Sequence, residues 1–182
     1  MKKVFIFLAE GFEETEAVAT IDIMLRGELD VTSVSITGNL LVTGAHGIAV
    51  KADTLFENAD ISSGDMLVLP GGMPGASNLN AHAGLKKTLE QYAASGKKIA
   101  AICAAPLVLG GLGLLQGKKA TAYPGYESTL KGATYVNNPV VKDGNILTGK
   151  GPGLVFNFGL AIVEELLGKE KADEVAAGLL LG

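Results

Sequence analysis

Short apolar runs alternate with segments of helical periodicity along most of this chain. Two of the runs, Met66–Leu69 and Ile99–Ile102, are almost wholly apolar, as are strands buried on both faces of a parallel sheet. We therefore expect an α/β fold in which helices cover both faces of a mostly parallel sheet. Strands are expected at Lys3–Leu8, Asp30–Ile36, Met66–Leu69, Ile99–Ile102 and Ala120–Tyr123, helices at Glu13–Arg26, Leu85–Ala94, from Pro106 onward, Leu154–Leu167 and Glu170–Ala177, and hairpins around Gly44–Gly47 and Lys142–Asn145.

Length and cysteine content set the expected organisation. A chain of 182 residues is most simply one domain, 1–182, which can bury a sizeable core without disulfides or a metal. Cys103 is the sole cysteine, so no disulfide forms within the chain. We therefore expect a reducing, cytoplasmic location.

Charge and hydropathy argue against two kinds of partner. The net charge is −4 and no Lys/Arg tract exceeds two residues, so we expect no nucleic-acid partner. The apolar start Met1–Ala9 is followed by glutamates and lacks a small-residue cleavage pattern, which favours a first strand over a signal. Ile99–Gln116 is uncharged but shorter than the roughly 20 residues that cross a bilayer, and Pro106 interrupts it, so we expect no membrane partner.

Cys103 lies where the buried strand Ile99–Ile102 should turn directly into a helix opened by Pro106. Proline is tolerated in the first turn of a helix, where its missing N–H is not needed. Amide groups at the start of that helix would point at the sulfur and lower the thiol pKa below its reference of about 8.5. For this segment alone, a buried cysteine that acts as a small apolar side chain is an equal alternative.

Three loops should meet beyond the carboxyl ends of the strands, where sites gather in such sheets. They comprise residues 9–16, 70–75 and 103–106, so carboxylates, a glycine-rich turn and a thiol share one cleft. Gly71 and Gly72 can present amide groups to an oxyanion. Paired glycines also occur in ordinary tight turns.

Four runs along the chain together resemble the ThiJ/PfpI family, in its branch of parkinsonism-associated deglycases. They are Ala9–Glu16, Val68–Gly72, Ala101–Pro106 and Gly151–Glu164, with similar spacing over almost the whole chain. The resemblance implies a flavodoxin-like three-layer sandwich in a single glutamine-amidotransferase-like domain, usually a homodimer. It also implies that Cys103 is the nucleophile, that Glu16 is a protonated acid beside it, and that the amides of Gly72 and Ala104 form an oxyanion pocket.

Glu16 has an ordinary alternative, because a glutamate in the first turn of a helix is favourable and frequently solvated. We expect that solvated role for Glu13 and Glu14. For Glu16 the resemblance favours function, since a buried carboxyl has the raised pKa that keeps it protonated.

Four further residues are candidates for substrate binding. Tyr123 stands where many family members have a histidine, and a phenol with a reference pKa of about 10 is a poor general base at neutral pH. Gly71 adjoins the oxyanion position. By resemblance Arg26 and His46 lie near the same pocket, although Arg26 also suits a surface ion pair and His46 an exposed turn.

The sequence contains no complete cofactor-binding motif of the kinds considered next. Gly144–Lys150 has the spacing of a phosphate loop, but Gly151 follows where a hydroxyl is needed. The chain has no Gly-x-Gly-x-x-Gly run and no His or Cys cluster for zinc. We therefore expect neither a cofactor nor a metal.

Three classes of function remain. We favour a cofactor-free enzyme in which the Cys103 thiolate attacks a small reactive carbonyl such as methylglyoxal and releases a hydroxy acid, as in the family's glyoxalase and deglycase activities. The alternative is an oxidative-stress sensor or chaperone that uses an oxidisable Cys103. A peptidase of the protease I type is disfavoured, because Tyr123 replaces the histidine.

Overall fold

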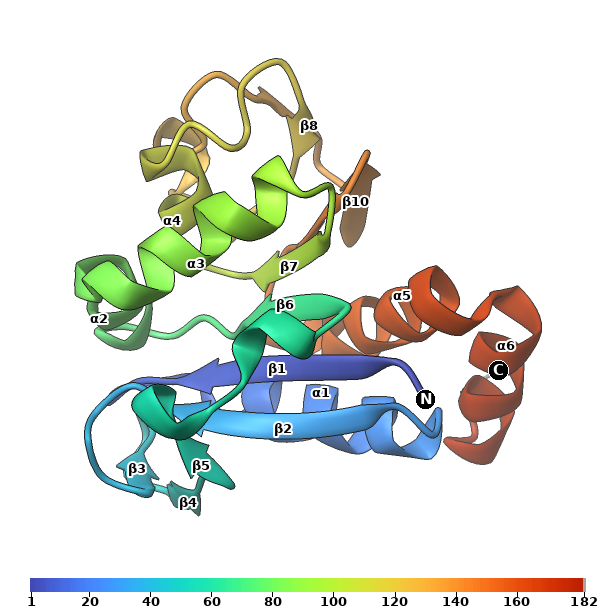
Figure 1. Ribbon diagram of the computed structural model, residues 1–182. Helices are drawn as coiled ribbons and strands as arrows, with labels where there is room; N and C mark the ends of the chain where they lie inside the picture. Colours follow the sequence, from blue (N-terminus) through green and yellow to red (C-terminus); the bar gives the residue numbers. More distant parts are fainter. Residues whose placement is uncertain (182) are drawn as a thin grey trace.

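The computed structural model describes residues 1–181, which form a mixed α/β fold around a seven-stranded sheet (Figure 1). All neighbouring strands are parallel except β10, which runs antiparallel to β11. The order β2-β1-β6-β7-β11 is the flavodoxin-like arrangement. Across the sheet the strands are β10 (Val140–Asp143), β11 (Ile146–Gly149), β7 (Lys98–Ile102), β6 (Met66–Leu69), β1 (Lys3–Leu8), β2 (Asp30–Ser35) and β5 (Thr54–Leu55).

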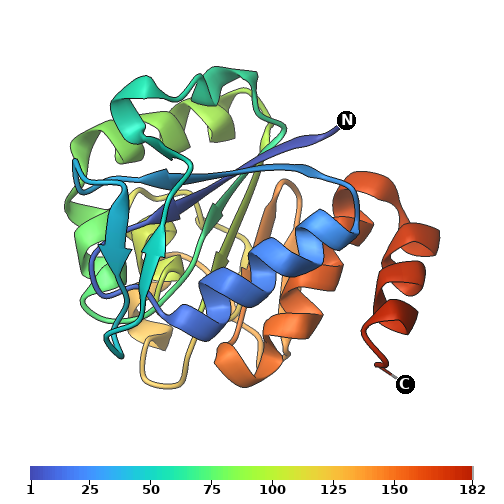
Figure 2. The same ribbon diagram turned by 90° about the horizontal axis from the view of Figure 1, so that it is seen from below.

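Helices cover both faces of the sheet and complete the three layers (Figure 2). On one face lie α1 (Glu14–Arg26) and α5 (Val155–Leu167), with α6 (Lys169–Gly178) packed against α5. On the other lie α2 (Gly75–Ala81), α3 (Ala83–Ala94) and α4 (Pro106–Gly111). The predicted fold class is confirmed, and none of the helices within residues 1–181 is long and apolar enough to span a bilayer.

Alternate side chains of each central strand supply two separate cores. Phe5 and Phe7 of β1 pack with the helices α3 and α4, whereas Val4 and Ile6 pack with α1 and α5. The same alternation holds along β6 and β7. Because both faces are buried, these strands read in the sequence as continuous apolar runs.

Two small sheets lie outside the central one. The hairpin β3 (Leu41–Thr43) and β4 (Ala49–Lys51) pairs in the register expected around Gly44–Gly47. The other sheet joins β8 (Lys119–Ala120) to β9 (Thr134–Tyr135). Short 3₁₀ turns complete the chain at Phe56–Asn58, Ile61–Ser63, Glu127–Thr129 and Pro152–Leu154.

The strand expected at Ala120–Tyr123 is wrong beyond its first residue. β8 ends at Ala120 and lies outside the central sheet. After it, Thr121 donates its amide to the Thr148 hydroxyl at 2.9 Å, and Tyr123 donates its amide to the Cys103 carbonyl at 2.9 Å. These two hydrogen bonds replace strand pairing and direct the chain toward the elbow, the sharp turn at Cys103 between β7 and α4.

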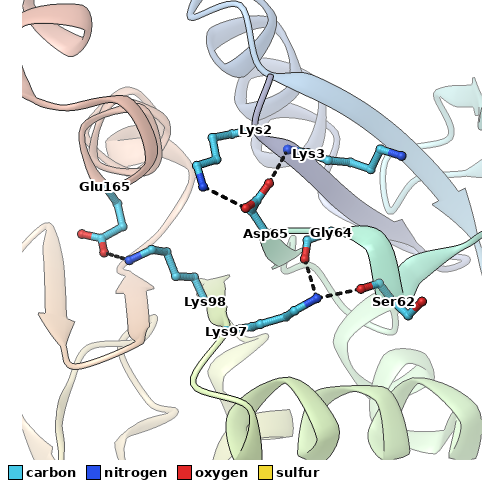
Figure 3. Close-up of polar contacts among 8 residues, drawn as sticks. All are labelled: Lys2, Lys3, Ser62, Gly64, Asp65, Lys97, Lys98 and Glu165. Atoms are coloured by element: carbon cyan, nitrogen blue, oxygen red, sulfur yellow. Dashed lines mark hydrogen bonds and ion pairs between the residues drawn. The ribbon is translucent and has the colours of Figure 1, made fainter.

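Polar contacts of charged side chains link the amino ends of β1, β6 and β7 (Figure 3). Cys103 follows the carboxyl end of β7 and so lies at the opposite edge of the sheet. Asp65 accepts hydrogen bonds from the Lys2 ammonium at 3.0 Å and from the Lys3 amide at 2.8 Å. Lys97 donates to the carbonyls of Ser62 and Gly64. Lys98 pairs with Glu165 of α5.

Two adjacent glycines at the end of α4 provide a test of the packing around the elbow. A Cβ on Gly110 would lie 2.0 Å from the Thr129 carbonyl oxygen, whereas a Cβ on Gly111 would lie 3.6 Å from its nearest neighbour. We expect Gly110→Ala to lower the free energy of unfolding by about 1–3 kcal/mol, as overpacking does. In urea unfolding, Gly111→Ala should match or exceed the wild type, and equal effects of the two substitutions would contradict the packing described.

Candidate active site

Cys103 occupies a sharp turn between β7 and α4. Its φ angle is 64°, a left-handed conformation that is uncommon outside glycine and that clusters at functional sites. Backbone bonds hold it there, because the Cys103 amide donates to the Gly149 carbonyl at 2.9 Å and the Tyr123 amide donates to the Cys103 carbonyl at 2.9 Å. The turn leaves Cys103 8% exposed, while its neighbours in β7 are fully buried.

Glu16 lies on the first turn of α1 and is completely buried. Its Oε2 atom accepts a hydrogen bond from the Gly71 amide at 2.8 Å, and its carboxyl is a close neighbour of the Cys103 thiol. Among residues 1–181, Oε1 has no hydrogen-bond partner. Burial raises the pKa of Glu16 to about 7, against the lowering effect of the Cys103 and Gly71 hydrogen bonds.

The thiol and the carboxyl titrate as one unit. Burial and the adjacent Glu16 carboxylate raise the pKa of Cys103 to about 12, although the amides of Gly72 and Ala104 lower it. The expectation that amides at the start of the helix lower the thiol pKa below its reference is wrong, because burial and Glu16 outweigh the amides of Gly72 and Ala104. From about pH 7 to about pH 12 the pair carries a single negative charge.

The Gly71–Gly72 turn lies between these two groups. A Cβ on Gly71 would lie 2.6 Å from the Cys103 Cβ and 2.7 Å from the Glu16 Oε2, so only glycine fits. The structure thus brings Cys103, Glu16, Gly72 and the Ala104 amide together. The Gly71 amide is bonded to Glu16 and is not free to bind a substrate, so a substrate contact by other atoms of Gly71 stays a prediction.

Of the two glutamates expected to be solvated at the start of α1, Glu14 is buried and Glu13 is partly exposed. Glu13 caps the helix, since its Oε2 accepts the Glu16 amide at 2.6 Å. Glu14 is buried, and its Oε1 accepts the amides of His46 at 2.6 Å and Ile48 at 3.4 Å. Glutamate is not among the preferred N-cap residues, so the residue type gave no signal for the cap. The one clue in the sequence was the spacing of Glu13 and Glu16, which resembles a capping box.

His46 and Arg26 lie apart from Cys103 within this chain. The His46 ring is exposed, and its Nδ1 lies 2.8 Å from the Glu14 Oε2, which raises the pKa of His46. Arg26 ends α1 and pairs with Asp22 at 2.7 Å. Ten residues of helix separate Arg26 from Glu16, or about 15 Å along the axis, so Arg26 does not reach the thiol of its own chain. A substrate contact by His46 stays a prediction.

Tyr123 adjoins Cys103 through the backbone bond described above, and its side chain is 45% exposed. The ring packs over Gly151, where an added Cβ would lie 3.1 Å from it. Together with Pro152 and Leu154 it lines a small cavity of about 250 Å³. Tyr123 therefore lies beside the elbow, as expected, although no strand carries it there.

One cluster among residues 1–181 has the groups that bind metal ions. Ligand atoms of Glu13, Glu14 and His46 lie within 4.8 Å of one another. Hydrogen bonds already engage both Glu14 oxygens, the Nδ1 atom of His46 and one oxygen of Glu13. The cluster is thus built as a hydrogen-bonded contact between α1 and the β3–β4 hairpin, and the absence of a metal requirement stays a prediction.

Comparison with known proteins adds relatives over the full chain. Protein DJ-1 homolog A of Arabidopsis thaliana is 45% identical over 99% of this chain, which spans only 47% of that relative. A glutathione-independent glyoxalase of Caenorhabditis elegans is 32% identical, over 94% of this chain and 92% of its own. The structure of oxidised Toxoplasma gondii DJ-1 superposes with a TM-score of 0.95 at 38% identity, over 99% of this chain and 98% of its own. Residues 2–165 match the DJ-1/PfpI family, and the chain belongs to that family.

Proposed function

We propose that this protein is a cysteine-dependent, cofactor-free enzyme that converts small reactive dicarbonyls, such as methylglyoxal, into hydroxy acids. The observation that carries the proposal is the placement of the Cys103 thiol beside the buried Glu16 carboxyl and the amides of Gly72 and Ala104. A buried nucleophile, a proton carrier and two amide donors are the groups that addition to a carbonyl needs. The named glyoxalase activity of the Caenorhabditis elegans relative supports this choice.

The reaction begins when the proton of the Cys103 thiol passes to the neighbouring Glu16 carboxylate, which leaves a thiolate beside a neutral acid. The sulfur attacks the aldehyde carbon, and the amides of Gly72 and Ala104 stabilise the alkoxide that forms. Glu16 gives this oxygen its proton, which yields a neutral hemithioacetal.

The resulting Glu16 carboxylate then removes the proton from the carbon that is bonded to sulfur. An enediol forms and is reprotonated at the neighbouring carbon, so that a hydroxyacyl thioester of Cys103 results. Water hydrolyses this thioester to the hydroxy acid and frees the thiol. The net reaction adds one water to methylglyoxal, with no external oxidant or reductant.

Oxidation sensing at Cys103 is the second candidate function. The solved structure of the oxidised Toxoplasma gondii relative favours it. A thiolate beside a protonated carboxyl is also the form that peroxides oxidise to sulfenic and sulfinic acids. Because both functions need the same ionised sulfur, the reactivity of the thiol does not distinguish them. Turnover of dicarbonyls does, since only the enzyme converts them.

Purified protein should convert methylglyoxal to lactate without added glutathione or metal. We expect the rate to rise with pH through about 7, as the pair loses its first proton, and then to level, because burial raises the second ionisation to about 12. Cys103→Ala should abolish turnover. Glu16→Gln should lower it by about 10²-fold or more, since an amide donates a hydrogen bond but transfers no proton.

The control for Glu16→Gln is the alkylation of Cys103, the sole thiol in the chain, which should remain rapid in that variant. Wild-type protein that alkylates readily but converts no dicarbonyl would favour the sensor function. Full turnover by Cys103→Ala would exclude the cysteine-dependent reaction.

Tyr123 should contribute to substrate binding and not to proton transfer. Its hydroxyl has no partner among residues 1–181, and Glu16 already supplies the proton. Tyr123→Phe should therefore cost about tenfold or less in kcat/KM, because one neutral hydrogen bond contributes roughly 0.5–1.5 kcal/mol. A loss above about a hundredfold, with normal Cys103 alkylation, would assign the acid role to Tyr123 instead.

We also propose that the chain forms a homodimer through α1 and the β3–β4 hairpin. Both elements present large apolar side chains to solvent, with Val18 47%, Leu25 52%, Leu41 59% and Ile48 60% exposed. Such apolar groups gathered on neighbouring elements are typical of an interface between subunits.

Light scattering should therefore report twice the chain mass of 18.6 kDa. Val18→Glu should shift this mass toward the monomer, because a buried unpaired charge is costly. Leu180→Glu is the control, since Leu180 is exposed near the chain end, outside both elements. A wild-type monomer at micromolar concentration would contradict the dimer.

A further inference from the structure

Glu13 contacts both halves of the proposed catalytic centre. Its side-chain Oε2 accepts the Glu16 amide at 2.6 Å, which fixes the first turn of α1 and thus the start of the Glu16 side chain. Its own amide donates to the Gly71 carbonyl at 2.9 Å. One residue therefore bonds the backbone of the acid and the loop that follows β6.

The second of these bonds sets the direction of an oxyanion donor. The Gly71 carbonyl and the Gly72 amide belong to one planar peptide, in which the C=O and N–H groups point in opposite directions. Because Glu13 holds the carbonyl on one side, the Gly72 amide points to the other side, where it contacts the Cys103 sulfur. The fit is tight, since a Cβ on Gly72 would lie 2.4 Å from the Glu13 nitrogen.

We propose that Glu13 is a positioning residue of the Cys103 centre, which holds the proton carrier Glu16 and the Gly72 oxyanion donor in register. This inference rests on the proposed function only where turnover of a dicarbonyl is measured. The alkylation of Cys103 reports on it independently.

The charge on Glu13 acts on a defined set of neighbours. Its negative charge adds to the burial that raises the pKa of Glu16, so it favours the form with a neutral carboxyl and a thiolate. Glu14 and His46 are the other titratable groups that face Glu13, within 4.8 Å, and they are paired with each other. Removal of the Glu13 charge should therefore disfavour transfer of the thiol proton to Glu16.

Three substitutions separate the effect of the Glu13 charge from that of the hydrogen bond by which Glu13 caps α1. Glu13→Asp keeps both, and aspartate is a preferred N-cap. Glu13→Gln keeps an oxygen acceptor and removes the charge, whereas Glu13→Ala removes both. Glu10→Gln is the matched control, because Glu10 precedes Glu13 on the same loop and its side chain accepts the Thr43 amide at 3.2 Å.

We expect Glu13→Gln to slow Cys103 alkylation at neutral pH by about threefold, a modest effect because the Glu13 side chain is partly exposed. Turnover should fall by the same factor. Glu13→Ala should lower turnover by about tenfold or more, beyond its effect on alkylation, because the acid and the oxyanion donor lose their alignment. Glu13→Asp should keep both rates close to those of the wild type, and Glu10→Gln should change neither rate.

Alkylation and turnover within twofold of the wild type in both Glu13→Gln and Glu13→Ala would overturn the proposal, as would a loss of melting temperature alone. Slower alkylation in Glu13→Gln, in a protein that converts no dicarbonyl, would sustain the positioning role and refute the proposed function. If Glu13→Ala fails to fold, the comparison of Glu13→Gln with Glu13→Asp still decides the effect of the charge.

Discussion

The hydrogen bond from the Gly71 amide to the buried Glu16 carboxyl is the contact on which the Cys103 centre depends. It joins the loop after β6 to the first turn of α1, two segments far apart in sequence that parallel strands bring to one edge of the sheet. The third segment, the elbow after β7, fits against both because Gly71 has no side chain. Substitution of any one of the three segments therefore disturbs the other two.

Burial determines how the Glu16 carboxyl and the Cys103 thiol ionise. A carboxyl group removed from water resists ionisation, and the thiol beside it resists ionisation too, so the pair holds two protons in acid and one over a wide range above neutrality. An exposed pair of the same residues would lose both protons nearer to their reference values. The fold thus holds one mobile proton between a nucleophile and an acid.

Much of this arrangement follows from the sequence, and the exceptions have physical causes. Apolar runs located the central strands because both of their faces are buried. The sequence patterns did not predict β5 or α2. β5 has only two residues, too few for a pattern, and α2 is a short helix of mixed polarity. The run after Ala120 looked like a strand, yet its amides bond to Thr148 and Cys103 instead of a ladder.

The chemistry of the site was less readable than its location. Motif positions brought Cys103 and Glu16 together, but the direction of the Cys103 pKa depends on burial and on the charge of Glu16, and neither is visible in a linear pattern. Glu14 looked solvated for the same reason, since the hairpin that buries it lies about thirty residues further along the chain. Sequence patterns describe neighbours along one element and fail where a distant segment covers a charge.

The order of the strands has a consequence for how copies of this chain meet. One border of the central sheet is β5, only two residues long, and the other is β10, which lies against the small sheet of β8. The Asp143 carboxylate at the end of β10 accepts the Lys119 amide at 2.8 Å. Short or covered borders offer few free amides to an incoming strand. The two terminal strands, β5 and β10, therefore offer little backbone for strand pairing between molecules.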